Sequence, residues 1–269
     1  MPPSLTFLLR LALSKCTPII THKMFSNTHT ICKICHTMPD DPTQKLLDQI
    51  YKRLLKQNGP LHWWPTSYES NQGFEIVTGA ILVQNTTWRN ARTALVNMHA
   101  EGIWGYQTVH NTMESKLATV IRSSGYHNIK AKKLKAFAKI ISCEYEGDDE
   151  RLFSQPLPEL RKRLMSIYGI GNETADDIIL YAAKKPSFVI DTYTRRIINR
   201  LGWKVRGNTY HDYQRLFSDN LEPNAKVWGE FHAQLDVHAG QVCRKIRPLC
   251  GQCVLADLCP TGRGHLSQQ

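Results

Sequence analysis

Four cysteines close to the C-terminal end have the residue type and the spacing of a metal centre. Cys243, Cys250, Cys253 and Cys259 follow the pattern C-x6-C-x2-C-x5-C. Four thiolates within so short a segment can surround a tetrahedral metal ion or an iron–sulfur cluster. Zinc sites with four cysteines are common, although the six-residue first gap is unusual for a zinc ribbon. Because these cysteines cluster, the pattern indicates a metal centre in a reduced cytosol rather than a disulfide framework.

The other four cysteines carry weaker signals. Cys16 and Cys143 stand alone, whereas Cys32 and Cys35 form a C-x-x-C. That pair lacks the β-α context of a redox motif and has no second pair of ligands nearby. We therefore assign the expected metal centre to the C-terminal four.

The stretch YGIGNETADDIILYA, residues 168–182, is a second candidate for chemistry. Gly169 and Gly171 stand between two segments with helical spacing, and a turn this tight needs backbone conformations that glycine supplies. The second helix begins at once, so its free N–H groups and the positive end of its dipole favour a phosphate oxygen. An ordinary turn between two helices is the alternative.

Asp191 is the candidate carboxylate. It follows the apolar Phe188, Val189 and Ile190 and precedes a helical pattern over 192–201. In isolation, an aspartate here is best explained as an N-cap whose side chain accepts the first N–H groups of the helix. A catalytic role becomes the better interpretation when the hairpin and the cysteine tail are considered with it.

The charge balance indicates a polyanionic partner. The chain has 269 residues and a formal net charge of +11, and basic side chains displace counterions from phosphates, which favours nucleic acid. Arg244, Lys245 and Arg247 lie in the first gap of the cysteine pattern, where a metal-bound loop would present them to a phosphate backbone. A solvated surface is the alternative for each group of cations. No apolar run approaches the length of a membrane span, so we expect no membrane partner.

The N-terminal segment differs from the rest of the chain. Residues 1–39 contain no Asp or Glu, a composition shared with transit peptides, but translation from Met24 or Met38 is the interpretation that we favour. We expect residues 1–40 to be a doubtful or disordered extension. The expected location is the cytoplasm, with association with the nucleoid, and organellar targeting is the alternative.

The elements that must position these residues are helices. Apolar residues recur at helical spacing from Asp41 onward, and no alternating strand pattern of useful length occurs. The first helix is expected to have Asp41 as its N-cap and to end at Gly59 and Pro60. A stripe of Phe74, Val77, Ala80 and Ile81 predicts a second. The whole pattern predicts an all-α fold, with further helices around 88–98, 114–122, 129–141, 157–167, 173–184, 192–201 and 225–239.

Taken in order, the glycine hairpin, Asp191 and the cysteine tail resemble the helix-hairpin-helix DNA glycosylases of the endonuclease III superfamily. The resemblance covers roughly residues 42 to 262. It implies two helical lobes with a DNA-binding cleft between them, and a four-iron four-sulfur cluster on the four cysteines. We accordingly expect a glycosylase domain over residues 41–269, with the iron–sulfur loop at 243–259.

The same resemblance implies roles for individual residues. Gly169 and Gly171 match the turn that binds a DNA phosphate, and Asp191 matches the essential carboxylate. Gln84, in LVQNTTW, matches a residue that fills the gap left in the duplex when the target nucleotide is taken out of the stack. A polar helix end is the alternative for Gln84.

Glu173 departs from the pattern of the bifunctional members. Those enzymes carry a lysine at this hairpin position, where its amine attacks the sugar and forms a Schiff base, which a carboxylate cannot do. Glu173 therefore favours a monofunctional glycosylase, and it also suits the first turn of a helix through the helix dipole. Lys184 and Lys185 lie nearby in sequence as substitute amines.

Two adjacent tryptophans suggest a substrate class. Trp63 and Trp64, in LHWWPTSYE, are followed by the Gln84 helix and by IRSSGYHNIKAKKL, and this order resembles the bacterial 3-methyladenine glycosylases of the superfamily. By that resemblance the two indoles line the base pocket, where their faces favour a positively charged base. Core packing is the alternative. Such enzymes can lack the cluster cysteines, whereas this chain keeps all four.

Three hypotheses remain at this point. The first is a monofunctional glycosylase, a monomer that acts on alkylated purines in damaged duplex DNA. The second is a bifunctional relative of endonuclease III that acts on oxidised pyrimidines, and the third is a DNA-binding protein without catalysis. Asp191 in its motif speaks against the third, and Glu173 speaks against the second.

Overall fold

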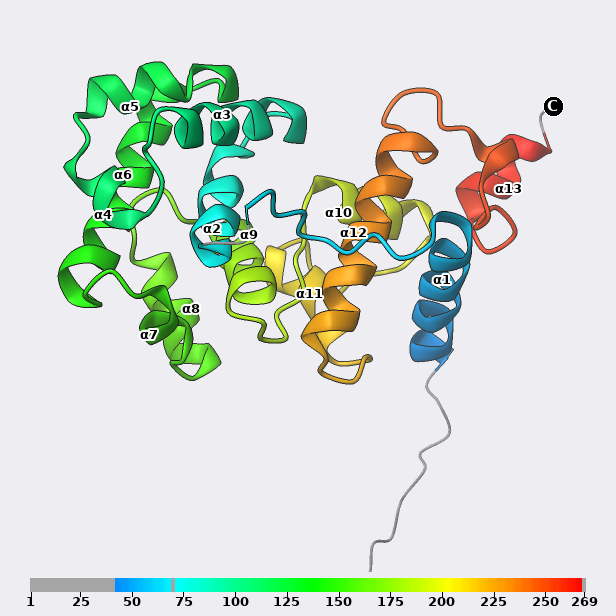
Figure 1. Ribbon diagram of the computed structural model, residues 1–269. Coiled ribbons are helices and arrows are strands. Elements are labelled where there is room, and N and C mark those ends of the chain that lie inside the picture. Colours follow the sequence, from blue (N-terminus) through cyan, green and yellow to red (C-terminus); the bar gives the residue numbers. More distant parts are fainter. Residues whose placement is uncertain (1–41, 69–70, 268–269) are drawn as a thin grey trace, which may run out of the picture. The chain divides into compact units, whose positions relative to one another are not determined.

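The helical spacing of apolar residues is realised throughout the part of the chain that the structure describes. The computed structural model describes residues 42–68 and 71–267, and within these ranges it contains helices, turns and loops and no β-strand (Figure 1). The prediction of an all-α fold is therefore confirmed. The N-terminal extension, the expected N-cap Asp41 and three cysteines (Cys16, Cys32 and Cys35) lie outside the described residues.

One lobe is built around two helices, α2 (Gln72–Leu82) and α6 (His127–Glu144). Every residue of α2 from Phe74 to Leu82 is buried, because other helices surround it. Against α6 pack α4 (Tyr106–Asn111) and α5 (Glu114–Val120). The lobe also contains α3 (Trp88–Ala100), η1 (Arg122–Ser124), α7 (Asp149–Phe153) and α8 (Leu157–Met165).

The other lobe is built around α12 (Ala225–Gln241), which packs against α1 (Pro42–Asn58) and α10 (Thr192–Arg200). The apolar face of α1 is buried as its spacing predicts, with Leu47, Ile50 and Leu54 in the core. Figure 1 shows α1 beside α12 although the two helices are far apart in the sequence. This lobe also contains α11 (Tyr210–Ser218), η3 (Cys250–Gln252) and α13 (Pro260–Leu266).

A short helical segment connects the two lobes. It comprises α9 (Asn172–Asp177) and η2 (Ile178–Ala182), and η2 packs against α2 on one side and α12 on the other. The sequence pattern predicts one α-helix over 173–184, but the last turn is a π-helix. A π-turn widens the helix by one residue and so changes which side chains face a neighbour, and such turns are frequent at functional sites.

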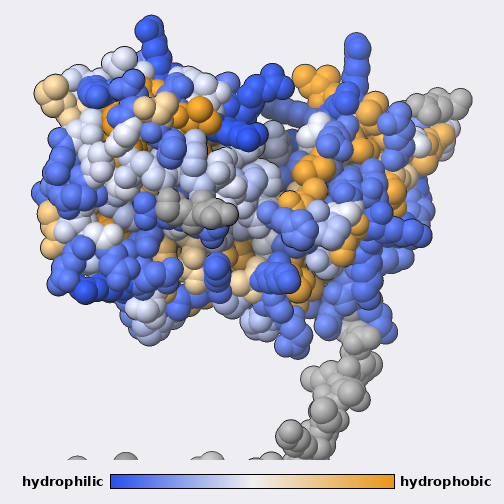
Figure 2. Space-filling view, viewed as in Figure 1, coloured by the Kyte–Doolittle hydropathy of each residue, from blue (hydrophilic) through white to orange (hydrophobic). Residues whose placement is uncertain are grey.

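The surface is largely hydrophilic. Figure 2 shows polar residues over most of the visible face, with small apolar groups scattered over both lobes. Among the helices of the described residues, none combines the length and the apolar character that crossing a membrane requires.

Candidate active site and cysteine centre

The hairpin between α8 and α9 depends on one glycine for its shape. Gly169 has φ of +85°, and a Cβ at this residue would lie 2.3 Å from Cγ of Lys133. A residue with a side chain would therefore be strained and would also clash. Gly171 is different, because its φ of −97° is open to any residue. The prediction that both glycines supply special backbone conformations is thus wrong for Gly171, whose missing side chain instead leaves open space in front of α9.

A buried ion pair fixes the hairpin to its surroundings. Asp176 has no exposed side-chain surface, and its carboxylate accepts a hydrogen bond of 2.9 Å from Nε of Arg161 on α8. Ser187 and Gln214 donate to the same carboxylate over 2.7 Å and 3.1 Å. Because Asp176 accepts hydrogen bonds from these three side chains, its charge is satisfied inside the protein, and α8, α9 and α11 are tied together.

Gln84 lies against the hairpin. Its Nε2 donates to the carbonyl of Gly169 over 3.1 Å and to Oγ1 of Thr174 over 2.8 Å, while its Oε1 accepts from Nζ of Lys133 over 2.5 Å. The structure therefore brings together Gln84 and the glycine turn, which the sequence separates by more than eighty residues.

A buried lysine supports the end of α2 that leads to Gln84. Lys130 is 2% exposed, and its Nζ donates to the carbonyls of Leu82 and Ser124, both over 2.7 Å. Burial lowers the pKa of this amine to about 8. Lys130 thus satisfies carbonyls at the end of the helix.

Asp191 caps α10, as one of its two sequence interpretations requires. Its Oδ1 accepts the backbone N–H of Thr194 over 2.6 Å. The preceding segment is fixed because Phe188 is buried against Phe217, with ring centroids 3.7 Å apart, and the N–H of Ile190 donates to the Tyr210 hydroxyl. The Asp191 side chain remains partly exposed at the end of this rigid segment.

Carboxyl groups gather around Asp191. Asp177 comes from α9, and Asp236 comes from α12. Burial raises the pKa of Asp177 and of Asp236 well above the ordinary range, and the charge of Asp191 raises both further. A carboxyl oxygen of Asp236 lies within 4.8 Å of one of Asp191. Burial and the charge of Asp191 thus favour the neutral form of both neighbours.

Glu173 belongs to the same group. Its side chain is exposed at the surface, yet protein atoms around it and the charge of Asp191 raise its pKa to about 7, while Arg195 opposes the rise. The residue that matches the family's lysine thus lies close enough to Asp191 to interact with it.

A histidine and a tyrosine complete the surroundings of Asp191. Tyr181 lies two helical turns after Glu173, and His232 lies one turn before Asp236. The Tyr181 hydroxyl is 2.7 Å from Nδ1 of His232 and 3.0 Å from the carbonyl of Gly229. Burial lowers the pKa of His232, so the ring is neutral at pH 7.

The loop with the two tryptophans is fastened at both ends. The N–H groups of Leu61 and His62 donate to the carboxylate of Glu230 over 2.8 Å and 3.2 Å. At the other end, Ser67 and a neighbouring tyrosine donate to the buried carboxylate of Glu75 on α2. The loop is thereby held across helices of both lobes.

The two indoles occupy different surroundings. Trp64 packs between Trp88 and Tyr181, with ring centroids 5.2 Å and 5.5 Å away, and a Cβ at Gly79 would lie 3.0 Å from its ring. Trp63 contacts the same cluster, with its centroid 5.6 Å from that of Trp88. It also lines a cleft of about 1110 Å³ together with Tyr181 and Lys184. The aromatic cluster and the groups around Asp191 thus meet at Tyr181.

The four cysteines of the C-terminal tail lie close to one another. Burial, and then the charges of the neighbouring cysteine thiolates, raise the pKa of Cys250, and the same causes raise the pKa of Cys253 to about 11. Backbone N–H groups point at two of the sulfurs, from Leu255 to Cys253 over 3.4 Å and from Gly262 to Cys259 over 3.3 Å. Four partly buried thiols with N–H donors directed at sulfur are the donor set that an iron–sulfur cluster takes as thiolates.

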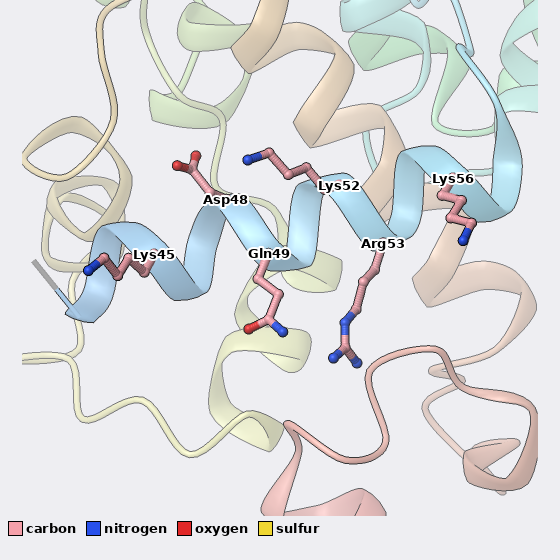
Figure 3. A pocket seen from close by; sticks show the side chains of 6 residues that line it. All are labelled: Lys45, Asp48, Gln49, Lys52, Arg53 and Lys56. Carbon is pink, nitrogen blue, oxygen red and sulfur yellow. The ribbon is translucent and has the colours of Figure 1, made fainter. Parts of the chain in front are cut away.

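Arginines hold this cysteine loop against the second lobe. Arg200 donates to Sγ of Cys243 over 3.2 Å and to the carbonyls of Arg244 and Lys245. Arg53 donates to the carbonyl of Val254 over 2.9 Å and to the carboxylate of Asp257. Figure 3 shows the face of α1 from which the Arg53 side chain extends; the other labelled residues of that face are Lys45, Asp48, Gln49, Lys52 and Lys56.

Comparison with known proteins places the chain in a family. Residues 78–223 match the HhH-GPD superfamily of base excision DNA repair proteins. A putative DNA repair glycosylase of Methanocaldococcus jannaschii is 37% identical over 216 residues, which cover 80% of this chain and 96% of that protein. Endonuclease III of Thermotoga maritima is 23% identical over 80% of this chain and 92% of its own length. The chain therefore belongs to the HhH-GPD superfamily of base excision DNA repair proteins.

Solved structures agree with this fold. The 3-methyladenine DNA glycosylase of H. pylori, bound to 1,N6-ethenoadenine, superposes with a TM-score of 0.63 at 26% identity and covers 74% of this chain and 97% of its own. A complex of endonuclease III with DNA superposes with a TM-score of 0.70 at 18% identity, over 83% of this chain and 98% of the other. The architecture is that of the helix-hairpin-helix glycosylases, as the sequence resemblance implies.

Four residues beside Asp191 were not predicted from the sequence, namely Asp177, Tyr181, His232 and Asp236. A signal was present, because Glu173, Asp177 and Tyr181 follow the i, i+4, i+8 spacing of one helix face, and His232 and Asp236 are four residues apart. The spacing along each helix does not show that these two helix faces pack against each other.

We expect Glu173→Gln to change stability in a pH-dependent way. The pKa of Glu173 is about 7 in the folded chain, against an ordinary value of 4.5, so the folded state holds a proton that the unfolded state loses as the pH rises through this interval. Stability contributed by this group therefore falls between these pH values. The variant should match the parent at pH 4.5 and exceed it at pH 8 by up to about 1 kcal/mol, because solvent screens this exposed side chain. Urea unfolding at both pH values measures the difference.

Glu159→Gln, an exposed glutamate on α8, is the matched control and should show no such pH dependence. An equal gain for Glu173→Gln at both pH values would contradict the assignment.

Proposed function

We propose that this chain is a monofunctional DNA glycosylase that hydrolyses the N-glycosidic bond of alkylated purines in duplex DNA. The observation that carries the proposal is the carboxyl group of Glu173, which interacts with Asp191 at the hairpin position where bifunctional members have an amine. The similarity to a glycosylase named for 3-methyladenine supports the substrate class.

Asp191 performs the central role in this proposal. Cleavage of the N-glycosidic bond builds positive charge on the deoxyribose, which the carboxylate of Asp191 stabilises. A water oxygen forms the new bond to C1′ and passes its proton to Asp191, while the electrons of the broken bond leave with the base. An alkylated purine that carries a positive charge therefore departs as a neutral base.

The hairpin and Gln84 bind the duplex in this proposal. The open space in front of Gly171 admits a phosphate oxygen to the N–H groups at the start of α9. Gln84 enters the gap that the extruded nucleotide leaves. Because Gln84 is hydrogen-bonded to the hairpin, phosphate binding and gap filling take place on one rigid unit.

Trp63 and Trp64 form the base pocket in this proposal. Trp63 lines the cleft, whereas Trp64 packs behind it against Tyr181. An indole face attracts a cation more strongly than it attracts a neutral ring, so the pair favours a positively charged base. The cleft also places Lys184 beside the aromatic cluster. This lysine and the similarity to endonuclease III favour the second candidate, a bifunctional enzyme acting on oxidised pyrimidines.

Cys243, Cys250, Cys253 and Cys259 hold a four-iron four-sulfur cluster in this proposal. The close approach of the four thiols and the N–H donors at two of them support it. Bound, the cluster supplies metal–sulfur bonds that fix the loop. Arg244, Lys245 and Arg247 of this loop are exposed and are proposed to contact DNA phosphates. The catalytic domain is proposed to comprise residues 41–269 and to act as a monomer on damaged duplex DNA.

The product assay tests the function directly. Purified protein is incubated with methylated duplex DNA and separately with a thymine-glycol duplex, and each reaction is assayed for free base, for nicking without alkali and for trapping by borohydride. We expect release of methylated base without nicking or trapping. Asp191→Asn should lose at least about a thousandfold in rate while binding DNA within about twofold.

Nicking and trapping on thymine glycol would instead establish the bifunctional candidate, and Lys184→Ala would then identify its amine. Appreciable turnover by Asp191→Asn would remove the role proposed for Asp191.

Trp63→Ala tests the base pocket. We expect the variant to lose about tenfold more activity on a cationic alkylated purine than on a neutral one, because about 1 to 2 kcal/mol of cation–π attraction disappears. Single-turnover rates on both bases measure the ratio. Trp203→Ala, outside the cleft, is the control, and equal losses on both bases would contradict the cation–π argument.

The metal centre has a test of its own. We expect purified protein to be brown, with broad visible absorbance and about four iron and four sulfide per chain. Cys253→Ser should lose the absorbance, whereas Cys143→Ser, the exposed cysteine on α6, should keep it. A colourless protein that contains one zinc would refute the cluster.

A further inference from the structure

The two helix faces beside Asp191 carry a series of polar groups to which the proposed reaction gives no role. Tyr181 lies on η2, and His232 and Asp236 lie one turn apart on α12. His232 has a side chain only 6% exposed, and its Nε2 faces Oδ1 of Asp236 at 3.9 Å, too far for a hydrogen bond. Both of these atoms are buried and lack a hydrogen-bond partner among the described residues.

The hydrogen bonds of Tyr181 assign the proton on His232. Its hydroxyl has one proton, and of its two neighbours only the carbonyl of Gly229 is unable to donate. Tyr181 therefore donates to Gly229, and Nδ1 of His232 donates to Tyr181. Because the ring is neutral, its Nε2 carries a lone pair that faces Asp236. A lone pair in this place disfavours a carboxylate and favours the neutral acid.

The contact between Asp236 and Asp191 requires a proton. Side-chain atoms of Asp191, His232 and Asp236 all lie within 4.8 Å of one another, so a small adjustment of either carboxyl brings the two within hydrogen-bonding distance. Two carboxylates so close cannot both be ionised without strong repulsion, so they share one proton. Glu173 and Asp177 on α9 also face Asp236. Both are acids, so their charges likewise raise its pKa and favour its neutral form.

We propose that Asp236 is a positioning residue for Asp191, which donates a hydrogen bond to the Asp191 carboxylate and is kept in its neutral form by the Tyr181–His232 pair. The role rests on the proposed function, because it concerns the carboxylate that acts on the sugar. The pair of acids then carries a single negative charge. With the N–H of Thr194 on one side and Asp236 on the other, the Asp191 carboxylate is held in one orientation.

Three variants test this role by their effect on the pH profile of the single-turnover rate. Asp236→Asn keeps a donor and should stay within about threefold of the parent at pH 7, whereas Asp236→Ala should lose about tenfold or more. The parent rate should fall at alkaline pH as Asp236 ionises and repels Asp191, and Asp236→Asn should lack this fall. DNA affinity should remain within about twofold in both.

Tyr181→Phe keeps the ring that packs against Trp64 but removes the hydroxyl. His232 is then free to carry its proton on Nε2 and to donate it to Asp236, which favours the carboxylate. The alkaline fall should therefore move to lower pH. A structural role alone would lower the rate without moving the profile. Asp219→Asn, an exposed aspartate at the end of α11, controls for the change of charge and should leave the profile unchanged.

A binding measurement separates this role from the proposed function. A duplex with a cationic pyrrolidine in place of the sugar imitates the charge that develops on it, and a tetrahydrofuran duplex is its neutral counterpart. At pH 7 the parent should prefer the pyrrolidine duplex, Asp191→Asn should lose the preference, and Asp236→Ala should lower it about tenfold.

Two results would overturn the positioning role while leaving Asp191 in place. One is that Asp236→Ala and Tyr181→Phe both keep the rate, the pH profile and the pyrrolidine preference of the parent protein. The other is an equal loss of rate in Asp236→Asn and Asp236→Ala, since the asparagine retains the donor. A parent protein without any pyrrolidine preference would instead refute the proposed function of Asp191, and the positioning role would fall with it.

Discussion

The site depends on the close approach of acidic groups where two helix faces meet. The connecting segment presents Glu173, Asp177 and Tyr181 on successive turns, and α12 presents His232 and Asp236 opposite them. Like charges at such distances repel strongly in a protein interior, where water does not screen them. The raised pKa values of Asp177 and Asp236 indicate how the arrangement is tolerated, because the shift favours their neutral forms and so lessens the repulsion. Asp191, at the rim of this group, keeps a partly exposed side chain.

Cations in this chain serve the fold as well as any partner. Arg161 neutralises the buried Asp176, and Arg200 holds the backbone of the cysteine loop. Arg196 donates to the carbonyls of Ala239 and Cys243 in the same way. The net charge of +11 therefore overstates the charge that is available to a polyanion, although it still favours one. Arginine is suited to this role because the planar set of donors on its guanidinium fixes the orientation of the bonded carboxylate or carbonyl and also supplies a positive charge.

The sequence predicted the helices better than it predicted how the helices pack against one another. Helical spacing predicts α1, α10 and α12 to within about two residues, because α1 and α10 each bury one apolar face and apolar residues recur at helical spacing along α12. The same spacing did not predict α11, although the capping box of Thr209 and Asp212 marks the start of this helix. The hairpin was predicted, but the reason given for Gly171 was wrong, since only Gly169 adopts a positive φ. The acids around Asp191 were missed because their proximity arises from the packing of α9, α10 and α12, which spacing along one helix does not contain.

Glu173 and its acidic surroundings belong together. A lysine at this position would face the carboxyl groups of Asp191, Asp177 and Asp236, and negative charge nearby raises the pKa of an amine and keeps it protonated. A protonated amine has no lone pair with which to attack C1′, so these surroundings oppose Schiff-base chemistry at the hairpin. With a pKa of about 7, Glu173 is partly protonated at neutral pH, which lessens its repulsion with Asp191. The crowding of acids and the absence of the lysine are thus two aspects of one electrostatic arrangement, which disfavours an amine nucleophile.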